Sequence, residues 1–141
     1  MNVADKSNEI VAIPKLLEMM AREGAIVTID AMGCQKAVAQ AIVSKQADYV
    51  LALKGNQGAL RADVEEFAAE QVASGFQDAT VTHHTETDGD HGRIDRRTIT
   101  VLHDLDWLRD RHPWPGLTAI VMVESLRETE AKSETERRFY I

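Results

Sequence analysis

Residues 25–30, which read Ala-Ile-Val-Thr-Ile-Asp, decide the fold that this sequence predicts. The run is rich in β-branched side chains and lacks strict alternation, a pattern typical of a strand that is covered on both faces. Residues 49–53, Tyr-Val-Leu-Ala-Leu, repeat this pattern. Between the two runs, residues 34–45 carry apolar side chains at helical spacing and predict an amphipathic helix. Because strand, helix and strand follow one another, we expect two parallel strands joined by a right-handed crossover.

Helices are expected before and after this unit. Ser7 has the character of a helix N-cap, and Pro14 fits the first turn, or a restart, of a helix at residues 15–22. Residues 59–74 predict a further helix. The order helix, strand, helix, strand, helix places residues 1–75 in the α/β class.

A different pattern begins after residue 75. Residues 80–85 and 96–101 are rich in threonine and roughly alternating, and residues 88–92 between them are turn formers. This predicts an antiparallel ribbon. We expect the ribbon to belong to a β-rich region, residues 76–141, that is distinct from the parallel sheet.

The end of the chain continues the β-rich pattern. One helical turn is expected at residues 106–110, and strands at 117–124 and 137–141 are separated by a charged turn at 127–135. The last residues have the character of a strand interior, so we expect the chain to be a fragment of a longer protein.

Composition excludes several classes of protein. The chain has 141 residues, 44% of them hydrophobic and 28% charged, which fits one globular unit and not a disordered, collagen-like or coiled-coil chain. Its apolar runs are far shorter than the about 20 residues that a membrane-spanning helix needs. The first residues do not resemble a secretory signal, and the single Cys34 cannot form an internal disulfide. A cytoplasmic protein with no membrane partner is expected.

The charge balance argues against nucleic acid as the main partner of this chain. It carries 16 basic and 23 acidic side chains, which give a net charge of -7 and a pI of about 5.2. This is the wrong sign for a protein whose main task is to grip a phosphate backbone. Composition therefore predicts weak DNA binding at most.

Asp30 is the leading candidate for a functional residue. It follows the first predicted strand, and ligands of open α/β sheets gather at the carboxyl ends of the strands. The alternative is that Asp30 only caps the following turn or helix. Metal-assisted phosphoryl transfer needs at least two carboxylates around Mg²⁺, a cation that prefers oxygen ligands, so Asp30 cannot complete such a site alone.

Polar residues after the second strand form another candidate site. Lys54, Asn56 and Gln57 belong to a glycine-containing loop that should reach the same edge of the sheet as Asp30. Their side chains suit contacts with phosphates or bases. The alternative is an ordinary exposed loop.

A segment rich in histidine and aspartate could supply ligands to Zn²⁺ or Mn²⁺. Its spacing matches no metal motif, and adjacent histidines on a strand point to opposite faces, so a solvated hairpin turn is the favoured interpretation. Cys34 opens a predicted helix, whose dipole lowers a thiol pKa, but without an evident partner base it is interpreted as structural. The possible metal ligands are His83, His84, Asp88, Asp90 and His91.

Several phrases of the sequence resemble one known family. The most specific is residues 27–35, Val-Thr-Ile-Asp-Ala-Met-Gly-Cys-Gln. The other phrases lie, in the same order as in the family, at residues 5–10, 48–57, 91–94, 114–117 and 136–141. Over nearly the whole chain, the sequence resembles the DDE-class insertion-sequence transposases, in the branch that includes the H-repeat-associated proteins.

The resemblance implies a partial RNase H-like core at residues 1–75, followed by a β-rich insertion at residues 76–141. In the family, three acids, Asp, Asp and Glu, hold two Mg²⁺ ions for the cleavage and joining of DNA strands. Asp30 matches the second acid. The first acid precedes the phrase at residues 5–10 and the glutamate follows the phrase at residues 136–141, so we expect both to be missing here.

The same resemblance bears on two further positions. Arg93, in the phrase at residues 91–94, joins Lys54, Asn56 and Gln57 as a candidate nucleic-acid contact. Asp95 departs from the pattern, because relatives often carry glutamate there, but it is not assigned to the catalytic acids.

We therefore expect a fragment of a DDE transposase that is inactive alone, with DNA as partner and Mg²⁺ as cofactor of the parent protein. Asp48, at the opposite edge of the sheet, and Asp63, on an exposed helix face, are poor substitutes for the missing acids. Two alternatives stay open: a non-enzymatic interaction or inhibitor module derived from a transposase, and a small α/β ligand-binding domain. Self-association is expected, because a sheet cut from a larger one leaves strand edges unpaired.

Overall fold

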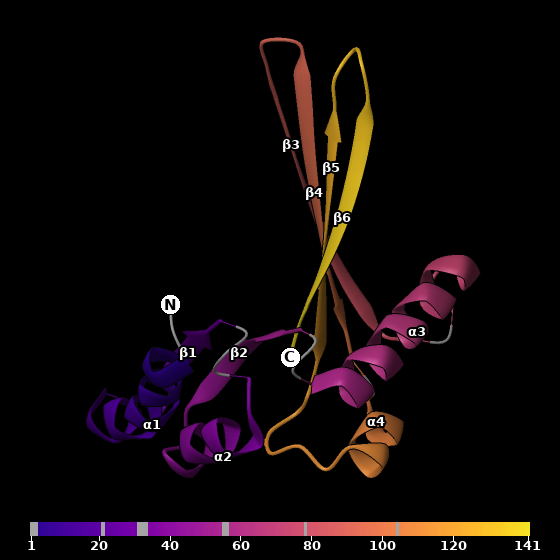
Figure 1. The fold of residues 1–141 in the computed structure, drawn as a ribbon. Coiled ribbons are helices and arrows are strands. Elements are labelled where there is room, and N and C mark those ends of the chain that lie inside the picture. The colour runs from indigo at the N-terminus through magenta and orange to yellow at the C-terminus, as the bar shows by residue number, and fades with distance from the viewer. Residues whose placement is uncertain (1–2, 21, 31–33, 55–56, 78, 104) are drawn as a thin grey trace.

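Figure 1 shows the structure, a computed structural model, in which long strands rise from a base of helices and shorter strands. It describes residues 3–20, 22–30, 34–54, 57–77, 79–103 and 105–141. The elements follow the order α1 (Val3–Met20), β1 (Ile26–Ile29), α2 (Lys36–Ser44), β2 (Asp48–Leu53), α3 (Gly58–Ser74), β3 (Val81–Asp90), β4 (Arg93–Leu102), α4 (Asp106–Arg111), β5 (Ile120–Glu128) and β6 (Ser133–Tyr140).

The strands form one six-stranded sheet in the order β1-β2-β6-β5-β4-β3. β1 and β2 are parallel, with Ile26 opposite Asp48 and Ile29 opposite Leu51, and α2 connects them. The other neighbouring pairs are antiparallel. The predicted parallel pair and the mixed α/β class are confirmed, whereas the RNase H-like assignment stays a prediction.

The predicted ribbon is formed by β3 and β4, which pair in antiparallel fashion along their whole length. However, the expectation that it belongs to a region distinct from the parallel sheet is wrong. β6 pairs with β2, where Ala52 lies opposite Tyr140. Leu51 and Ile141 also exchange backbone hydrogen bonds of 2.8 and 3.0 Å. One sheet therefore runs through both predicted parts, and a division of the chain at residue 75 stays a prediction.

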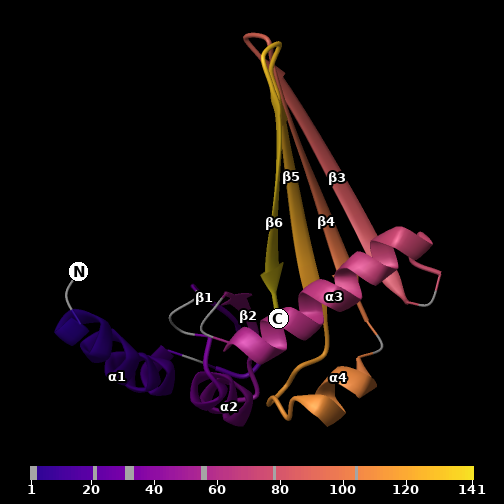
Figure 2. The same ribbon diagram turned by 45° about the vertical axis from the view of Figure 1, so that its right-hand side comes forward.

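The outer parts of β3, β4, β5 and β6 extend beyond the helices in both views (Figure 1, Figure 2). We use the term arm for residues 84–98 and 124–137, and the term body for the rest of the described chain. β5 and β6 are longer than predicted, so most of the expected charged turn at residues 127–135 is strand. The ladder accommodates this charge because opposite charges face one another across it, as Arg127 faces Glu134.

The hydrophobic core lies on one face of the sheet. Buried residues of the strands point to this face and meet buried residues of α2, α3 and α4; the strand residues are Leu51, Leu53, Leu102, Ile120, Met122 and Phe139. The opposite face carries residues that are only half-buried, such as Val50 and Val121. The expectation of strands covered on both faces is therefore wrong for the described chain, because its helices pack their buried side chains against one face.

Helix α1 differs from the expectation, whereas α3 and α4 agree with it. α1 continues from Val3 to Met20 with Pro14 inside it, so the expected restart at this proline is wrong. Proline lacks the N–H of the helical ladder, but the second half of α1 is anchored by Leu17, which packs in a cluster with α2. α3 ends at Gly75, whose φ of 68° suits glycine. None of the described helices is long and apolar enough to cross a membrane.

Candidate functional site

Asp30 is exposed and directly follows β1, at the carboxyl end of the parallel pair. β2 runs in the same direction and is followed by Lys54, so both residues reach the same edge of the sheet, as predicted. A hollow of about 630 Å³ opens there. It is lined by residues of β1, β2, α3 and β6: Thr28, Ile29, Asp30, Val50, Ala52, Leu53, Lys54, Arg61, Glu136, Arg137, Arg138, Phe139 and Tyr140.

The hollow is locally basic, although the chain as a whole is acidic. Four basic residues line it, namely Lys54, Arg61, Arg137 and Arg138, against the acids Asp30 and Glu136. The net charge of -7 is therefore spread over other surfaces. An acidic group beside several cations suits a ligand that brings both a phosphate and a metal ion.

Arg61 is held firmly in this hollow. Its Nη1 donates a hydrogen bond of 2.5 Å to the backbone oxygen of Leu53, at the end of β2. Its Nε lies 2.5 Å from Oε1 of Glu65, one helical turn further along α3. The guanidinium carbon is 5.1 Å from the centre of the Phe139 ring. These contacts fix the cation where β2 ends and α3 begins.

The other basic side chains of the hollow differ in whether an ion pair holds them. Nε of Arg137 lies 2.6 Å from Oε2 of Glu124, and Nε of Arg138 lies 3.2 Å from Oε1 of Glu136. The hydrogen bond to Glu136 raises the pKa of Arg138, so this side chain stays charged. Lys54 forms no ion pair within the described part of the chain. It is therefore the cation best placed to meet a ligand.

The loop after β2 is tied to the segment after β1. Nε2 of Gln57 donates a hydrogen bond of 3.0 Å to the backbone oxygen of Cys34. Gln57 thus lies at the Asp30 edge, as predicted, whereas Asn56 lies outside the described residues. Because the amide of Gln57 holds two segments together, it helps to shape the edge whatever the ligand.

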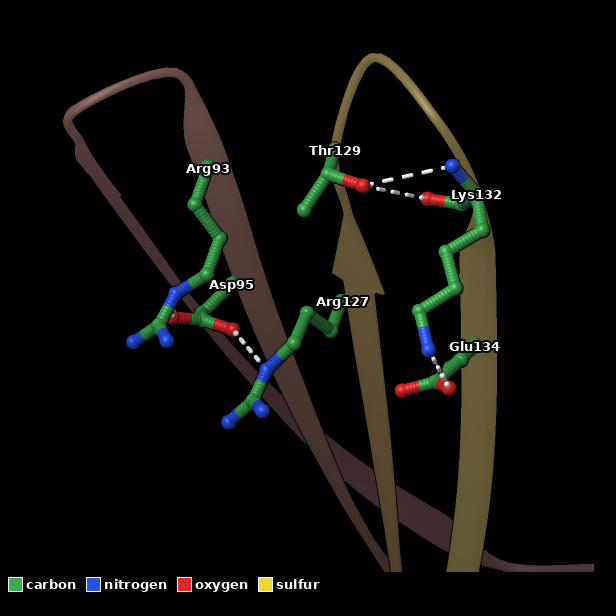
Figure 3. A network of polar contacts seen from close by, with 6 residues as sticks. All are labelled: Arg93, Asp95, Arg127, Thr129, Lys132 and Glu134. Atoms are coloured by element: carbon green, nitrogen blue, oxygen red, sulfur yellow. Dashed lines mark hydrogen bonds and ion pairs between the residues drawn. The ribbon is translucent and has the colours of Figure 1, made fainter.

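Arg93 is placed apart from these residues, at the outer end of the arm. Figure 3 shows it in a network with Asp95, the residue that departs from the family pattern, and with Arg127. Nε of Arg93 lies 2.9 Å from Oδ2 of Asp95, and Nε of Arg127 lies 3.2 Å from its Oδ1. The same end of the arm carries an ion pair of 2.6 Å between Lys132 and Glu134. Arg93 therefore does not join the hollow beside Asp30.

The described residues do not complete a metal site. No group of three or more His, Cys, Asp or Glu side chains suited to a metal occurs among them. The acids that line the hollow are Asp30, which directly follows β1, and Glu136, which pairs with Arg138. This donor set fits part of a Mg²⁺ site and not the whole of one.

The histidines of the candidate Zn²⁺ or Mn²⁺ site lie along β3 and in the turn that follows it. Nδ1 of His83 lies 3.0 Å from the Thr100 hydroxyl. Nε2 of His84 lies 3.1 Å from Glu86, and Nε2 of His91 lies 3.3 Å from Asp90. Each ring nitrogen therefore has a different partner, which agrees with the favoured interpretation of a solvated hairpin.

Asp48 and Asp63, the acids considered as substitutes for the missing ones, differ in how well the structure matches the expectation. Asp48 opens β2 opposite Ile26, at the far end from Asp30, as expected. The expectation for Asp63 is wrong: its side chain is mostly buried, and its Oδ2 lies 2.5 Å from Nε2 of His112. The segment after α4 packs on α3 and covers this carboxylate, which helix periodicity alone does not indicate.

Cys34 is fully buried and precedes α2, which begins at Lys36. Burial raises the pKa of its thiol to about 11, because the thiolate would lose its hydration. The proposed lowering of this pKa by a helix dipole is therefore outweighed by burial. A protonated, covered thiol is no nucleophile, which supports the structural interpretation.

Sequence reasoning missed Arg61, Arg137 and Arg138 as residues of the hollow. Arg137 and Arg138 are adjacent in a quoted phrase, but neighbours on a strand point to opposite faces, so their shared place depends on the twist and pairing of β6. The sequence shows the adjacent basic pair, but it does not indicate that the pair lies beside Asp30.

Comparison with known proteins decides the family. The family model described as Transposase DDE domain matches residues 1–135. The chain belongs to this family. The resemblance to DDE transposases, drawn from six short phrases, is thereby confirmed.

Two relatives are similar to the chain over nearly its whole length, and one of them is named as a putative transposase. The chain is 47% identical over 139 residues to a protein of Xanthobacter autotrophicus named "Uncharacterized protein in dhlA 3'region", covering 99% of the chain and 46% of that relative. It is 38% identical over 143 residues to the "H repeat-associated putative transposase YhhI" of Escherichia coli strain K12, covering 97% of the chain and 37% of that relative. The chain thus spans less than half the length of these relatives. No solved structure matches it.

Proposed function

We propose that this chain is part of a DDE transposase, and that Asp30 is one of the carboxylates that bind Mg²⁺ in the whole protein. The observation that carries the proposal is the position of Asp30, at the carboxyl edge of a parallel strand pair and beside a basic hollow. Membership of the family supports it. When bound, the metal would stabilise the charge on the attacking and leaving oxygens of the phosphodiester.

The chain's own residues have separate tasks in this proposal. The Asp30 carboxylate offers hard oxygen ligands to Mg²⁺. Lys54 and Gln57 bind phosphate oxygens or bases of DNA at the same edge, and Arg61 and Arg138 add positive charge. Asn56 is proposed as a further DNA contact from its place in the sequence. Arg93 binds DNA as well, provided that the duplex follows the arm to its outer end.

We further propose that the isolated chain does not cut DNA. Two-metal phosphoryl transfer requires several carboxylates around ions about 3.5–4 Å apart. Among the described residues, no group of three or more His, Cys, Asp or Glu side chains is suited to hold a metal ion. The remaining metal ligands would come from residues other than the described ones. The chain by itself would therefore bind metal weakly and leave plasmid DNA intact.

Metal binding at Asp30 is tested by titrating Mn²⁺ into isotopically labelled protein and recording NMR line broadening. The proposal expects broadening centred on Asp30 and its neighbours in the hollow. It should vanish in Asp30→Asn and persist in Asp48→Asn, a matched change at the opposite end of the strand pair. Broadening that is absent near Asp30, or equal in both variants, would overturn the metal role.

Catalysis is tested by incubating the purified chain with supercoiled plasmid and Mg²⁺. We expect no nicking above the buffer blank. Nicking that disappears in Asp30→Asn would contradict the incomplete site and show that the chain supplies all the ligands it needs.

DNA contact is tested by fluorescence anisotropy with a short labelled duplex at low salt. We expect weak binding that falls steeply as salt rises, because phosphate contacts release counterions. Lys54→Ala should weaken it further, whereas Lys45→Ala, just after α2, should not. Equal effects of the two changes would remove Lys54 from the proposed contact surface.

A second candidate function is a non-enzymatic module that binds other chains. The observation that favours it is that β1 is an end strand of the sheet that the described residues form. Such a module would inhibit an intact transposase by binding to it, and this chain would not need to bind a metal ion. Inhibition that is unchanged in Asp30→Asn would favour this function. The third possibility, a small α/β ligand-binding domain, would use the same hollow for a small molecule.

A further inference from the structure

The parallel strand pair and the antiparallel strands of the sheet meet where Ala52 and Leu53 of β2 pair with β6. Leu53, the last residue of β2, lies opposite Phe139. The residues next to this position line the hollow, since Lys54 directly follows β2 and Arg138 directly precedes Phe139. The geometry of the hollow therefore depends on how β2 and β6 meet.

Arg61 contacts both strands at this junction. Its Nη1 donates to the backbone oxygen of Leu53, and its guanidinium lies over the ring of Phe139, the residue opposite Leu53. Both views place the beginning of α3, the helix that carries Arg61, near the end of β6 (Figure 1, Figure 2). Its Nε pairs with Glu65 on the next turn of α3. One side chain of α3 thus holds β2 and β6 at the same place.

The chemistry of arginine suits this task. A guanidinium is planar and directs several N–H groups at fixed angles, so it can contact a carbonyl, a carboxylate and a ring face together. A lysine ammonium carries the same charge on a single nitrogen and cannot reach all three. The side chain of Arg61 is 24% exposed, compared with 38% for Arg137 and 61% for Arg138. Of these three arginines, Arg61 is therefore the least accessible to a ligand.

We propose that Arg61 is a positioning residue of the hollow, which fixes β2 against β6 and so holds Lys54 and Arg138 beside Asp30. The inference rests on the proposed function, because this hollow is the surface at which we place DNA. Cations that are not held in place must be ordered when a ligand binds, and this ordering lowers affinity. Arg61 thus acts on DNA binding mainly through the geometry of its neighbours, and its own charge contributes less.

The first test compares two substitutions that keep the positive charge, using fluorescence anisotropy with a short labelled duplex at low salt. Arg61→Lys should weaken binding at least about fivefold, because lysine cannot make the three contacts together. Arg109→Lys is the matched control: Arg109 of α4 also donates to a backbone oxygen, that of Leu117, and also pairs with an acid, Asp106. It should leave binding unchanged. Equal binding by the wild type and Arg61→Lys would overturn the proposal.

A second pair of variants separates geometry from charge, and it keeps the proposal testable if Arg61→Lys fails to fold. Glu65→Ala removes a negative charge near the hollow, which electrostatics alone predicts to strengthen DNA binding. The proposal expects weaker binding, because Nε of Arg61 loses its partner. Glu66→Ala removes the same charge from the neighbouring, exposed position of α3 and should not weaken binding. Stronger binding in both variants would contradict the positioning role.

Hydrogen exchange of the junction tests the same role without DNA. The backbone N–H groups of Leu51 and Ile141 each donate to the other residue's oxygen. Arg61→Lys should lower the protection of these two amides at least about tenfold relative to amides between β4 and β5, because a local opening exposes only local hydrogen bonds. Protection that is unchanged at the junction, or lowered equally over the whole sheet, would overturn the proposal. If the wild type binds no DNA, the proposed DNA contact fails, and exchange at the junction still decides the role of Arg61.

Discussion

In the body, strands and helices meet through fully buried apolar side chains such as Leu51, Leu102 and Leu108. In the arm, by contrast, nearly every side chain of β3 and β6 is exposed, and the contacts across the strands are polar. They include the ion pair between Glu124 and Arg137. The body therefore depends on apolar burial, whereas the arm depends on backbone hydrogen bonds that continue the ladder of the body.

This difference has a consequence for the sequence of each region. A buried position of the body demands a side chain of a given size, because protein interiors are close-packed. A position in the arm accepts many residues, provided that they tolerate an extended backbone and do not place like charges opposite one another. The described residues of the most specific family phrase, 27–30 and 34–35, accordingly lie in the body.

The largest expected effect comes from a cavity in the body. Leu51→Ala should lower the free energy of unfolding by about 2–5 kcal/mol, because Leu51 is fully buried in β2. Leu126→Ala, the same change at a half-buried site of the arm, should cost about 1 kcal/mol or less. Urea unfolding of both variants measures the contrast, and equal losses would show that the arm also depends on apolar burial.

The chemistry of the only cysteine provides a second test of the buried body. With a thiol pKa of about 11, Cys34 should react with iodoacetamide at pH 8 roughly 100-fold more slowly in the folded chain than in urea. Mass spectrometry over time measures this. A rate that matches the unfolded chain would mean that the body opens around Cys34.

The same thiol predicts how stability changes with pH. Its folded pKa lies above the unfolded value of about 8.5, so its contribution is intact below that pH and is lost as pH rises towards 11. Burial also raises the pKa of Tyr49, which acts in the same direction. Cys34→Ala should therefore reduce, and not abolish, the alkaline fall in unfolding free energy.

The connection between α4 and β5 provides the third test. Gly116 has a φ of 71°, and a Cβ there would lie 2.7 Å from Cγ2 of Val43 and 3.2 Å from Cε1 of Tyr49. Gly116→Ala should cost about 2–4 kcal/mol, from a left-handed backbone and a clash.

Gly24→Ala is its matched control. Gly24 has a φ of 79°, but a Cβ there meets no described atom within 4 Å, so only the backbone cost of about 1–2 kcal/mol is expected. Thermal unfolding of both variants separates the clash from the backbone cost. Equal losses would mean that the connection does not pack closely on the body.

The smallest effect is expected at the outer end of the arm. Asp95 pairs with Arg93 and Arg127, and Asp88 lies directly opposite Asp95 on β3. Asp95→Asn should cost at most about 1 kcal/mol, because these ion pairs are exposed. Asp88→Asn should be neutral or slightly stabilising, because it removes a like charge. A loss above about 2 kcal/mol in either variant would mean that ion pairs hold the arm together.

Much of the fold could be predicted because its signals are local. The β-branched runs at residues 25–30 and 49–53, and the helical spacing between them, indicated the parallel pair that the structure contains. The turn residues at 88–92 indicated the ribbon of β3 and β4. Asp30 was placed correctly at the carboxyl edge because strand direction alone determines which end of a strand it follows.

The sequence by itself determined most of the elements, the parallel pair and the edge at which Asp30 lies, since each depends on residues close together in the chain; it also indicated the family, through short local phrases. Only the tertiary structure decided that β6 joins β2 in one sheet, that Arg61 and Arg138 share a hollow with Asp30, and that Asp63 is covered by His112. These contacts join residues far apart in sequence. Their partners are selected by packing and by competition among strand edges, which local periodicity does not record.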